Sequence, residues 1–136
     1  MKVVVDSNRV IAALLKDSTT REILYNDQFE FIAPELMIEE ITKYKDVFIE
    51  KGKITSEEFE ELLALLFEKI TLIPHEEYEN QLHDLMNKIS DKKDTPFLAC
   101  CLSTKAEGIW SHDPHFLEQK KVKVFTNKDL LDISKI

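Results

Sequence analysis

The chain has 136 residues, a formal net charge of −8 and only two glycines. It therefore contains neither Gly-rich phosphate loop, GxxxxGK[ST] or GxGxxG, and its acidic balance disfavours non-specific binding to nucleic acid. No apolar run approaches the roughly 20 residues of a membrane span. Asp6 and Arg9 interrupt any signal-peptide pattern, so we expect a cytoplasmic protein with no membrane partner. The adjacent Cys100 and Cys101 indicate core residues in a reducing compartment.

Short apolar strands alternate with helical patterns along the whole chain, whose length suits one domain over residues 1–136. Strands are expected at residues 2–5, 29–33, 70–73, 108–111 and 122–125. Helices are expected at residues 8–18, 19–27, 34–52, 76–89 and 97–106, with others beginning at Thr55, after Asp113 and at Thr126. Such alternation predicts an α/β three-layer sandwich with a central parallel sheet of about four to five strands.

The longest predicted helix covers residues 34–52 and has Pro34 in its first turn. Its apolar stripe consists of Met37, Ile41, Tyr44 and Phe48. At about 100° per residue, Glu40 lies near the edge of this stripe and Glu39 lies nearly opposite it. We therefore expect Glu40 to be able to point into a pocket and Glu39 to face solvent.

Four acids fall where a parallel sheet would place a ligand site. Asp6 and Asp113 follow two strands, and ligands bind beyond the carboxyl ends of such strands. Asp94 opens a helix whose N-terminus is expected at the same edge. Singly, Asp6 and Asp94 could be helix caps, Asp113 a turn residue and Glu40 a surface acid. Together, these carboxylates would repel one another, and Mg²⁺ or Mn²⁺ would relieve that repulsion and support displacement at phosphorus.

The stretches VVVDSN, PELMIEEI, DKKDTPFLACCLS and IWSHDPHF, in this order and at these separations, resemble the PIN domain family over nearly the whole chain. The resemblance implies an α/β sandwich and a Mg²⁺- or Mn²⁺-dependent ribonuclease, as in VapC toxins of toxin–antitoxin pairs. It implies that the catalytic and metal-binding acids are Asp6, Glu40, Asp94 and Asp113. Supporting polar residues on the same motifs are Ser7, Asn8 and Ser111.

Several residues around these motifs keep more than one interpretation. Asp91 is either a supporting acid or a turn residue. Arg9, Lys92 and Lys93 are candidates for phosphate contacts or plain surface charges. Many relatives carry an acid where this chain has His115. His112 and His115 flank Asp113, and a zinc pair, surface imidazoles and substrate contacts all remain open.

Three functions remain open from the sequence. The first is a metal-dependent endoribonuclease acting on single-stranded or looped RNA, for which the family implies a possible antitoxin partner and a possible homodimer. The second is a non-catalytic PIN module that binds RNA or protein, although four retained acids argue against it. The third is a phosphatase of the haloacid dehalogenase type, which needs an acid where Asn8 stands.

Overall fold

The computed structural model describes residues 1–15, 17–51, 54–86 and 93–135. Five parallel strands form one sheet in the order β3-β2-β1-β4-β5. The strands are β1 (Lys2–Val5), β2 (Glu30–Pro34), β3 (Ile70–Ile73), β4 (Gly108–Trp110) and β5 (Val124–Phe125). The predicted parallel α/β sandwich is therefore confirmed.

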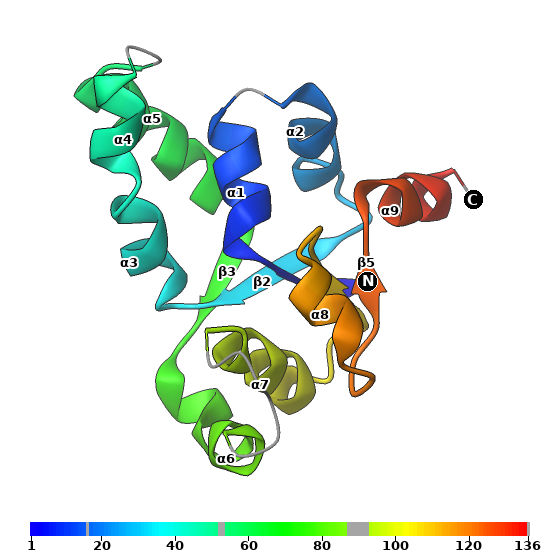
Figure 1. Cartoon of the computed structure of the whole chain (residues 1–136). Coiled ribbons are helices and arrows are strands. Elements are labelled where there is room, and N and C mark those ends of the chain that lie inside the picture. Colours follow the sequence, from blue (N-terminus) through cyan, green and yellow to red (C-terminus); the bar gives the residue numbers. More distant parts are fainter. Residues whose placement is uncertain (16, 52–53, 87–92, 136) are drawn as a thin grey trace.

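Helices cover both faces of this sheet (Figure 1). They are α1 (Ser7–Leu14), α2 (Ser18–Leu24), α3 (Met37–Thr42), α4 (Lys45–Glu50), α5 (Ser56–Phe67), α6 (His75–Leu85), α7 (Thr95–Thr104), α8 (Pro114–Glu118) and α9 (Asn127–Ser134). Helices α1, α2, α5 and α9 lie on one side, and the paired helices α6 and α7 lie on the other, with α7 against β1, β2 and β4. No helix within the described ranges is long and apolar enough to cross a bilayer.

The direction in which the chain adds strands to the sheet reverses beside β1, and this reversal determines where the site lies. The chain adds β2 and then β3 on one side of β1, and later adds β4 and β5 on the other. A crevice forms at the carboxyl ends of the strands where the order reverses. Asp6 follows β1 and Ser111 follows β4, and the Asp6 amide donates to the Trp110 carbonyl at 3.0 Å. Both side chains therefore lie at this crevice.

The start of the long predicted helix is wrong. Pro34 is the last residue of β2, where it pairs in register with Ile73, and α3 begins only at Met37. Proline lacks an amide hydrogen but its fixed φ suits an extended strand end. The ladder continues because the Glu35 amide donates to the Ile73 carbonyl at 3.0 Å.

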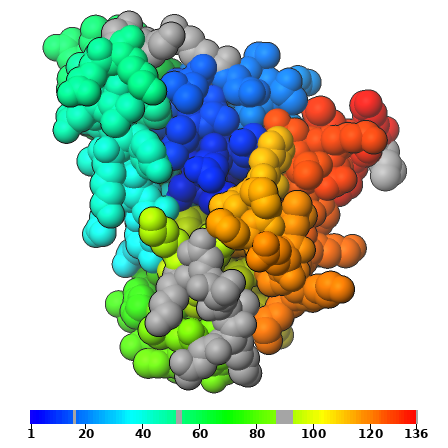
Figure 2. Space-filling view, in the orientation of Figure 1, coloured from blue at the N-terminus to red at the C-terminus, as the bar shows by residue number. Residues whose placement is uncertain are grey.

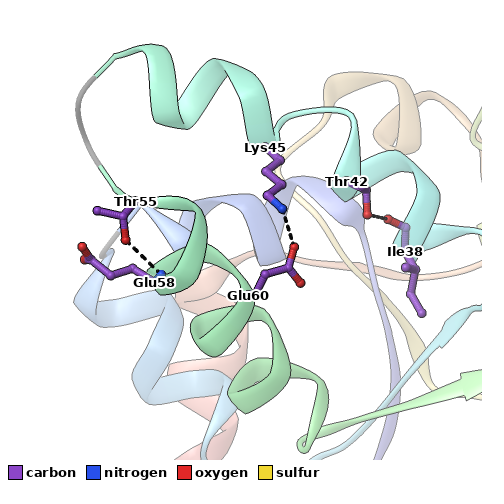
Figure 3. Close-up of polar contacts among 6 residues, drawn as sticks. All are labelled: Ile38, Thr42, Lys45, Thr55, Glu58 and Glu60. Atoms are coloured by element: carbon purple, nitrogen blue, oxygen red, sulfur yellow. Dashed lines mark hydrogen bonds and ion pairs between the residues drawn. The ribbon is translucent and has the colours of Figure 1, made fainter.

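The same helix is also interrupted, between α3 and α4. The Thr42 hydroxyl donates to the Ile38 carbonyl at 2.7 Å (Figure 3), a side-chain bond that competes with the helical backbone and often bends a helix. The Tyr44 amide then bonds three residues back to Ile41, which tightens the turn. Met37, Ile41 and Phe48 are buried as predicted, whereas Tyr44 is 44% exposed, so its place in the buried stripe was wrong.

Side-chain contacts hold helix α4, the second part of the interrupted helix, against α5. Lys45 and Glu60 form an ion pair at 2.7 Å (Figure 3), and the rings of Phe48 and Phe59 contact each other with centroids 5.9 Å apart. Thr55, where this helix was expected to begin, caps α5: its hydroxyl accepts from the Glu58 amide at 3.1 Å. The α4–α5 pair thus has its own small apolar contact beside the sheet.

The other predicted elements are present with shorter ends. Observed α1 and α2 end at Leu14 and Leu24, and β5 spans two residues where four were predicted. The close approach of β5 explains Gly108 in β4, because a Cβ there would lie 2.6 Å from the Lys123 carbonyl oxygen. The C-terminal end of the predicted 76–89 helix lies outside the described residues.

Candidate active site

A pocket of about 160 Å³ lies at the carboxyl ends of β1 and β4. Four carboxylates line it, from Asp6, Glu40, Asp94 and Asp113. They come from the turn after β1, from α3, and from the residues preceding α7 and α8. The surfaces of α1, α3 and α8 meet on one face of the molecule, shown blue, cyan and orange in Figure 2. The structure therefore brings together all four acids of the predicted site, whose chemical roles remain predictions.

Asp6 is buried and held by a hydroxyl. It is 6% exposed, and the Ser111 hydroxyl donates to its Oδ2 atom at 2.7 Å. Burial raises the pKa of Asp6, the Ser111 hydrogen bond opposes that rise, and the charge of Asp113 adds to it. The Asn8 amide lies close enough to lower this pKa, but Asp6 makes no capping hydrogen bond of good geometry to α1. The Asp6 carboxylate is thus directed to the crevice and not to helix capping.

Glu40 reaches the same pocket from the opposite side. The Ser7 hydroxyl donates to its Oε2 atom at 3.1 Å. Burial raises the pKa of Glu40, Ser7 opposes that rise, and the charge of Asp6 raises it further. Glu39 is exposed and is absent from the residues that line this pocket. The helical phase argued from the sequence agrees with these positions.

Asp113 joins Asp94 and His115 in a compact donor set. The Asp113 amide donates to the Ser111 hydroxyl at 2.9 Å, and its Oδ1 atom accepts from the His115 amide at 2.9 Å as the cap of α8. One ligand atom from each of Asp94, Asp113 and His115 lies within 4.8 Å of the others. His115 was not among the predicted site residues. Its position two residues after Asp113, where relatives carry an acid, was the signal that could have included it.

The order of these acids along the chain and their arrangement around one crevice agree with the comparison to known families. A family model described as PIN domain matches residues 4–128. The chain belongs to the PIN domain family. No curated protein matches it. PIN domains are generally nucleases that use divalent metal ions, and the acidic pocket of this PIN domain is consistent with that chemistry.

The donor set fits a hard divalent cation. Carboxylate oxygens are the preferred ligands of Mg²⁺ and Mn²⁺, and an imidazole nitrogen is a better ligand for the later transition metals than for Mg²⁺. Burial raises the pKa values of Asp6 and Glu40, neighbouring negative charge raises them further, and a bound cation would favour the charged carboxylates. The donor atoms of Asp94, Asp113 and His115 lie close enough together to be candidate ligands of such an ion.

His112 has a different environment from His115. Its Nε2 atom accepts from the Asn127 amide at 3.0 Å, while the Asn127 side chain accepts from Trp110 Nε1 at 2.8 Å. Burial lowers the pKa of His112, and the nearby Arg9 charge lowers it further. In the described part of the chain, His112 lies outside the metal donor set and connects β4 to the start of α9. The two histidines therefore do not act as a pair in this arrangement.

The remaining predicted supporting residues divide between the pocket and its surroundings. Ser7, Asn8 and Lys93 line the pocket. Arg9 lies near Asp6 but is not among the residues that line the pocket, and its Nε atom has no hydrogen-bond partner among the described residues. Asp91 and Lys92 lie outside the described residues.

Proposed function

We propose that this PIN domain is a Mg²⁺- or Mn²⁺-dependent endoribonuclease that hydrolyses phosphodiester bonds of RNA. The supporting observation is the convergence of Asp6, Glu40, Asp94 and Asp113, from four separate segments, on one pocket at the strand-order reversal. Such a pocket repels a polyanion unless cations neutralise it, so a metal ion is integral to the proposal.

Asp94, Asp113 and His115 would hold one ion. Ser111 links Asp113 to Asp6, because its hydroxyl accepts from the Asp113 amide and donates to the Asp6 carboxylate. The bound ion supplies positive charge that stabilises the phosphoryl transition state and makes water more acidic. The tie between Asp6 and Ser111 keeps a buried carboxylate directed at the crevice. This bond joins the residues that directly follow two neighbouring strands, β1 and β4.

Two acids can orient the water that attacks phosphorus. Hydrolysis adds one water across the bond: its oxygen joins phosphorus as a proton passes to a base, the P–O bond to the ribose oxygen breaks, and the leaving oxygen takes up a proton from the protonated base or from solvent. Glu40 or Asp94 takes that role, and the hydrogen bond from Ser7 fixes the position of Glu40. Lys93, which lines the same pocket, contributes a cation for the phosphate.

We further propose that the enzyme is the toxin of a toxin–antitoxin pair. An antitoxin would block the exposed part of the acidic pocket with a basic side chain placed among the four carboxylates. A neighbouring gene for a small DNA-binding protein, whose product co-purifies with this chain and suppresses RNA cleavage, would support this assignment. Cleavage unaffected by that product would contradict it.

The nuclease proposal is tested with purified protein and end-labelled RNAs that contain single-stranded loops. We expect cleavage in Mg²⁺ or Mn²⁺, none in chelator, and loss of cleavage in Asp94→Asn. The matched control is Asp27→Asn, which removes an exposed acid far from the pocket. Equal degradation by wild type and Asp94→Asn would assign the activity to a contaminant. Binding of RNA without cleavage under every metal condition would favour the non-catalytic module.

Metal binding has a readout that does not depend on activity. An ion that binds only the folded state stabilises it by mass action, by about 2.7 kcal/mol at 100 times the dissociation constant. We expect millimolar Mn²⁺ or Mg²⁺ to raise the Tm measured in chelator, and Asp113→Asn to remove most of that rise. An unchanged Tm in both metals would overturn the metal site.

A further inference from the structure

A second hollow adjoins the acidic pocket on the side of α3. Its volume is about 360 Å³, which falls in the range of roughly 300–1,000 Å³ typical of small-ligand sites. Glu40, Tyr44 and Lys93 line both hollows. An RNA strand bound at the four acids can therefore continue directly into this second hollow, which we call the Tyr44 subsite.

The Tyr44 subsite has a different chemistry from the acidic pocket. Leu36, Pro96 and the ring of Tyr44 give it apolar surface. Two cations, Lys43 and Lys93, line it beside two acids, Glu39 and Glu40. The charges of both lysines lower the pKa of Glu40, so both lie near the acidic pocket. An aromatic ring, apolar walls and cations together match a nucleotide, which has a flat base and an anionic phosphate.

The exposure of Tyr44 follows from the interruption of the long helix. A continuous helix would have placed this ring in the buried stripe with Ile41 and Phe48. The turn between α3 and α4 instead leaves Tyr44 44% exposed, with its ring stacked at 6.4 Å on that of Phe48. The ring is thus supported from within the protein and presented at the mouth of the acidic pocket.

We infer that the Tyr44 subsite binds one unpaired nucleotide of the RNA, adjacent to the scissile phosphate, with its base stacked on Tyr44 and its phosphate near Lys43 and Lys93. The inference rests on the proposed function for the reaction at the acids. A base that stacks on a side chain must leave its duplex, so the substrate is single-stranded at this position. Stacking tolerates any base, so this subsite selects strand structure and not sequence.

The test is direct binding of a single-stranded RNA oligonucleotide that carries 2-aminopurine, whose fluorescence is quenched on stacking. Titrations use protein with Asp113→Asn, in which the probe stays intact. We expect Tyr44→Ala to weaken binding about 5- to 150-fold and to abolish the quench, since stacking contributes roughly 1–3 kcal/mol per base. Tyr44→Trp should retain both signals. Tyr25→Ala is the matched control, because Tyr25 is 43% exposed beside Lys69 and lines neither hollow.

Further measurements distinguish a failure of this inference from a failure of the proposed nuclease activity. In otherwise wild-type protein, Tyr44→Ala should raise KM and leave kcat within about threefold, and a fully paired duplex should bind both proteins equally. Cleavage by the wild type with unchanged affinity, quench and KM in Tyr44→Ala would overturn the subsite and leave the nuclease standing. Tyr44-dependent binding and quench without any cleavage would support the subsite and overturn the nuclease. Equal Tyr44 dependence for single-stranded DNA would overturn the assignment to RNA.

Discussion

The hydroxyl of Ser111 donates a 2.7 Å hydrogen bond to the carboxylate of Asp6, two residues that lie 105 positions apart in the chain. Ser111 is 1% exposed, so water does not replace this bond. The same oxygen accepts from the Asp113 amide at 2.9 Å. One hydroxyl therefore couples the acids that follow β1 and β4.

Ser111→Ala should lower the free energy of unfolding at pH 7 by about 1–3 kcal/mol, because Asp6 would be left buried without its donor. Loss of the bond also raises the pKa of Asp6 further. The deficit should therefore shrink as the pH falls and Asp6 is protonated. Urea denaturation at pH 7 and pH 5 measures both effects.

Ser111→Thr should recover most of the loss, and the exposed Ser18→Ala should change nothing. A deficit independent of pH would show that packing, not the hydrogen bond, matters at this position.

His115 should affect metal preference. His115→Ala is expected to weaken Mn²⁺ binding by at least roughly 10- to 100-fold. That range is typical when a residue that only hydrogen-bonds to a metal ligand is removed, and a ligand itself should matter at least as much. His115→Asp should restore binding and shift the preference toward Mg²⁺, because oxygen ligands suit the harder ion. Tm shifts across Mn²⁺ and Mg²⁺ titrations measure this ratio. His83→Ala, an exposed histidine on α6, is the control. Equal titrations for wild type and His115→Ala would remove His115 from the donor set.

Glu40 and Glu39 form an internal pair of matched variants. Glu40→Gln should reduce kcat by about 10²- to 10⁴-fold if Glu40 orients the attacking water, the range typical of a general base. Glu39→Gln should have little effect on kcat, because Glu39 is exposed and lines the Tyr44 subsite but not the acidic pocket. Single-turnover cleavage of one RNA compares the two. The opposite pattern would mean that the helix presents the other carboxylate to the substrate.

Alkaline pH should destabilise the protein through its two buried thiols. Burial raises the pKa of Cys100 and of Cys101 from 9.0 to about 12. Above pH 9 the unfolded chain loses these protons while the folded chain keeps them, so stability falls by about 1.4 kcal/mol per thiol per pH unit up to about pH 12. Tm measured between pH 8 and pH 10.5 should drop steeply, and less steeply in Cys101→Ala. Rapid alkylation of the folded protein by iodoacetamide at pH 8 would contradict this protection.

Local patterns predicted much of the architecture because local physics controls those features. Short β-branched runs separated by helical patterns indicate a parallel sheet with helices on both faces, and such a sheet is present. The 100° helical repeat distinguished Glu40 from Glu39, which depends only on the phase within one helix. The positions of Asp6 and Asp113 after strands followed from the same alternation.

The sequence alone determined the parallel α/β class and the family motifs, and it predicted the four acids that line the pocket. Tertiary structure decided the rest, because it depends on contacts between distant segments. The hydrogen bonds of Asp6 to Ser111 and of Glu40 to Ser7 exist only once the sheet and α3 are assembled. The end of β2 at Pro34 depended on pairing with β3, and the exposure of Tyr44 depended on the packing of α4 against α5. Helical periodicity reports which face of a continuous helix is apolar, but it does not report where tertiary contacts end that helix.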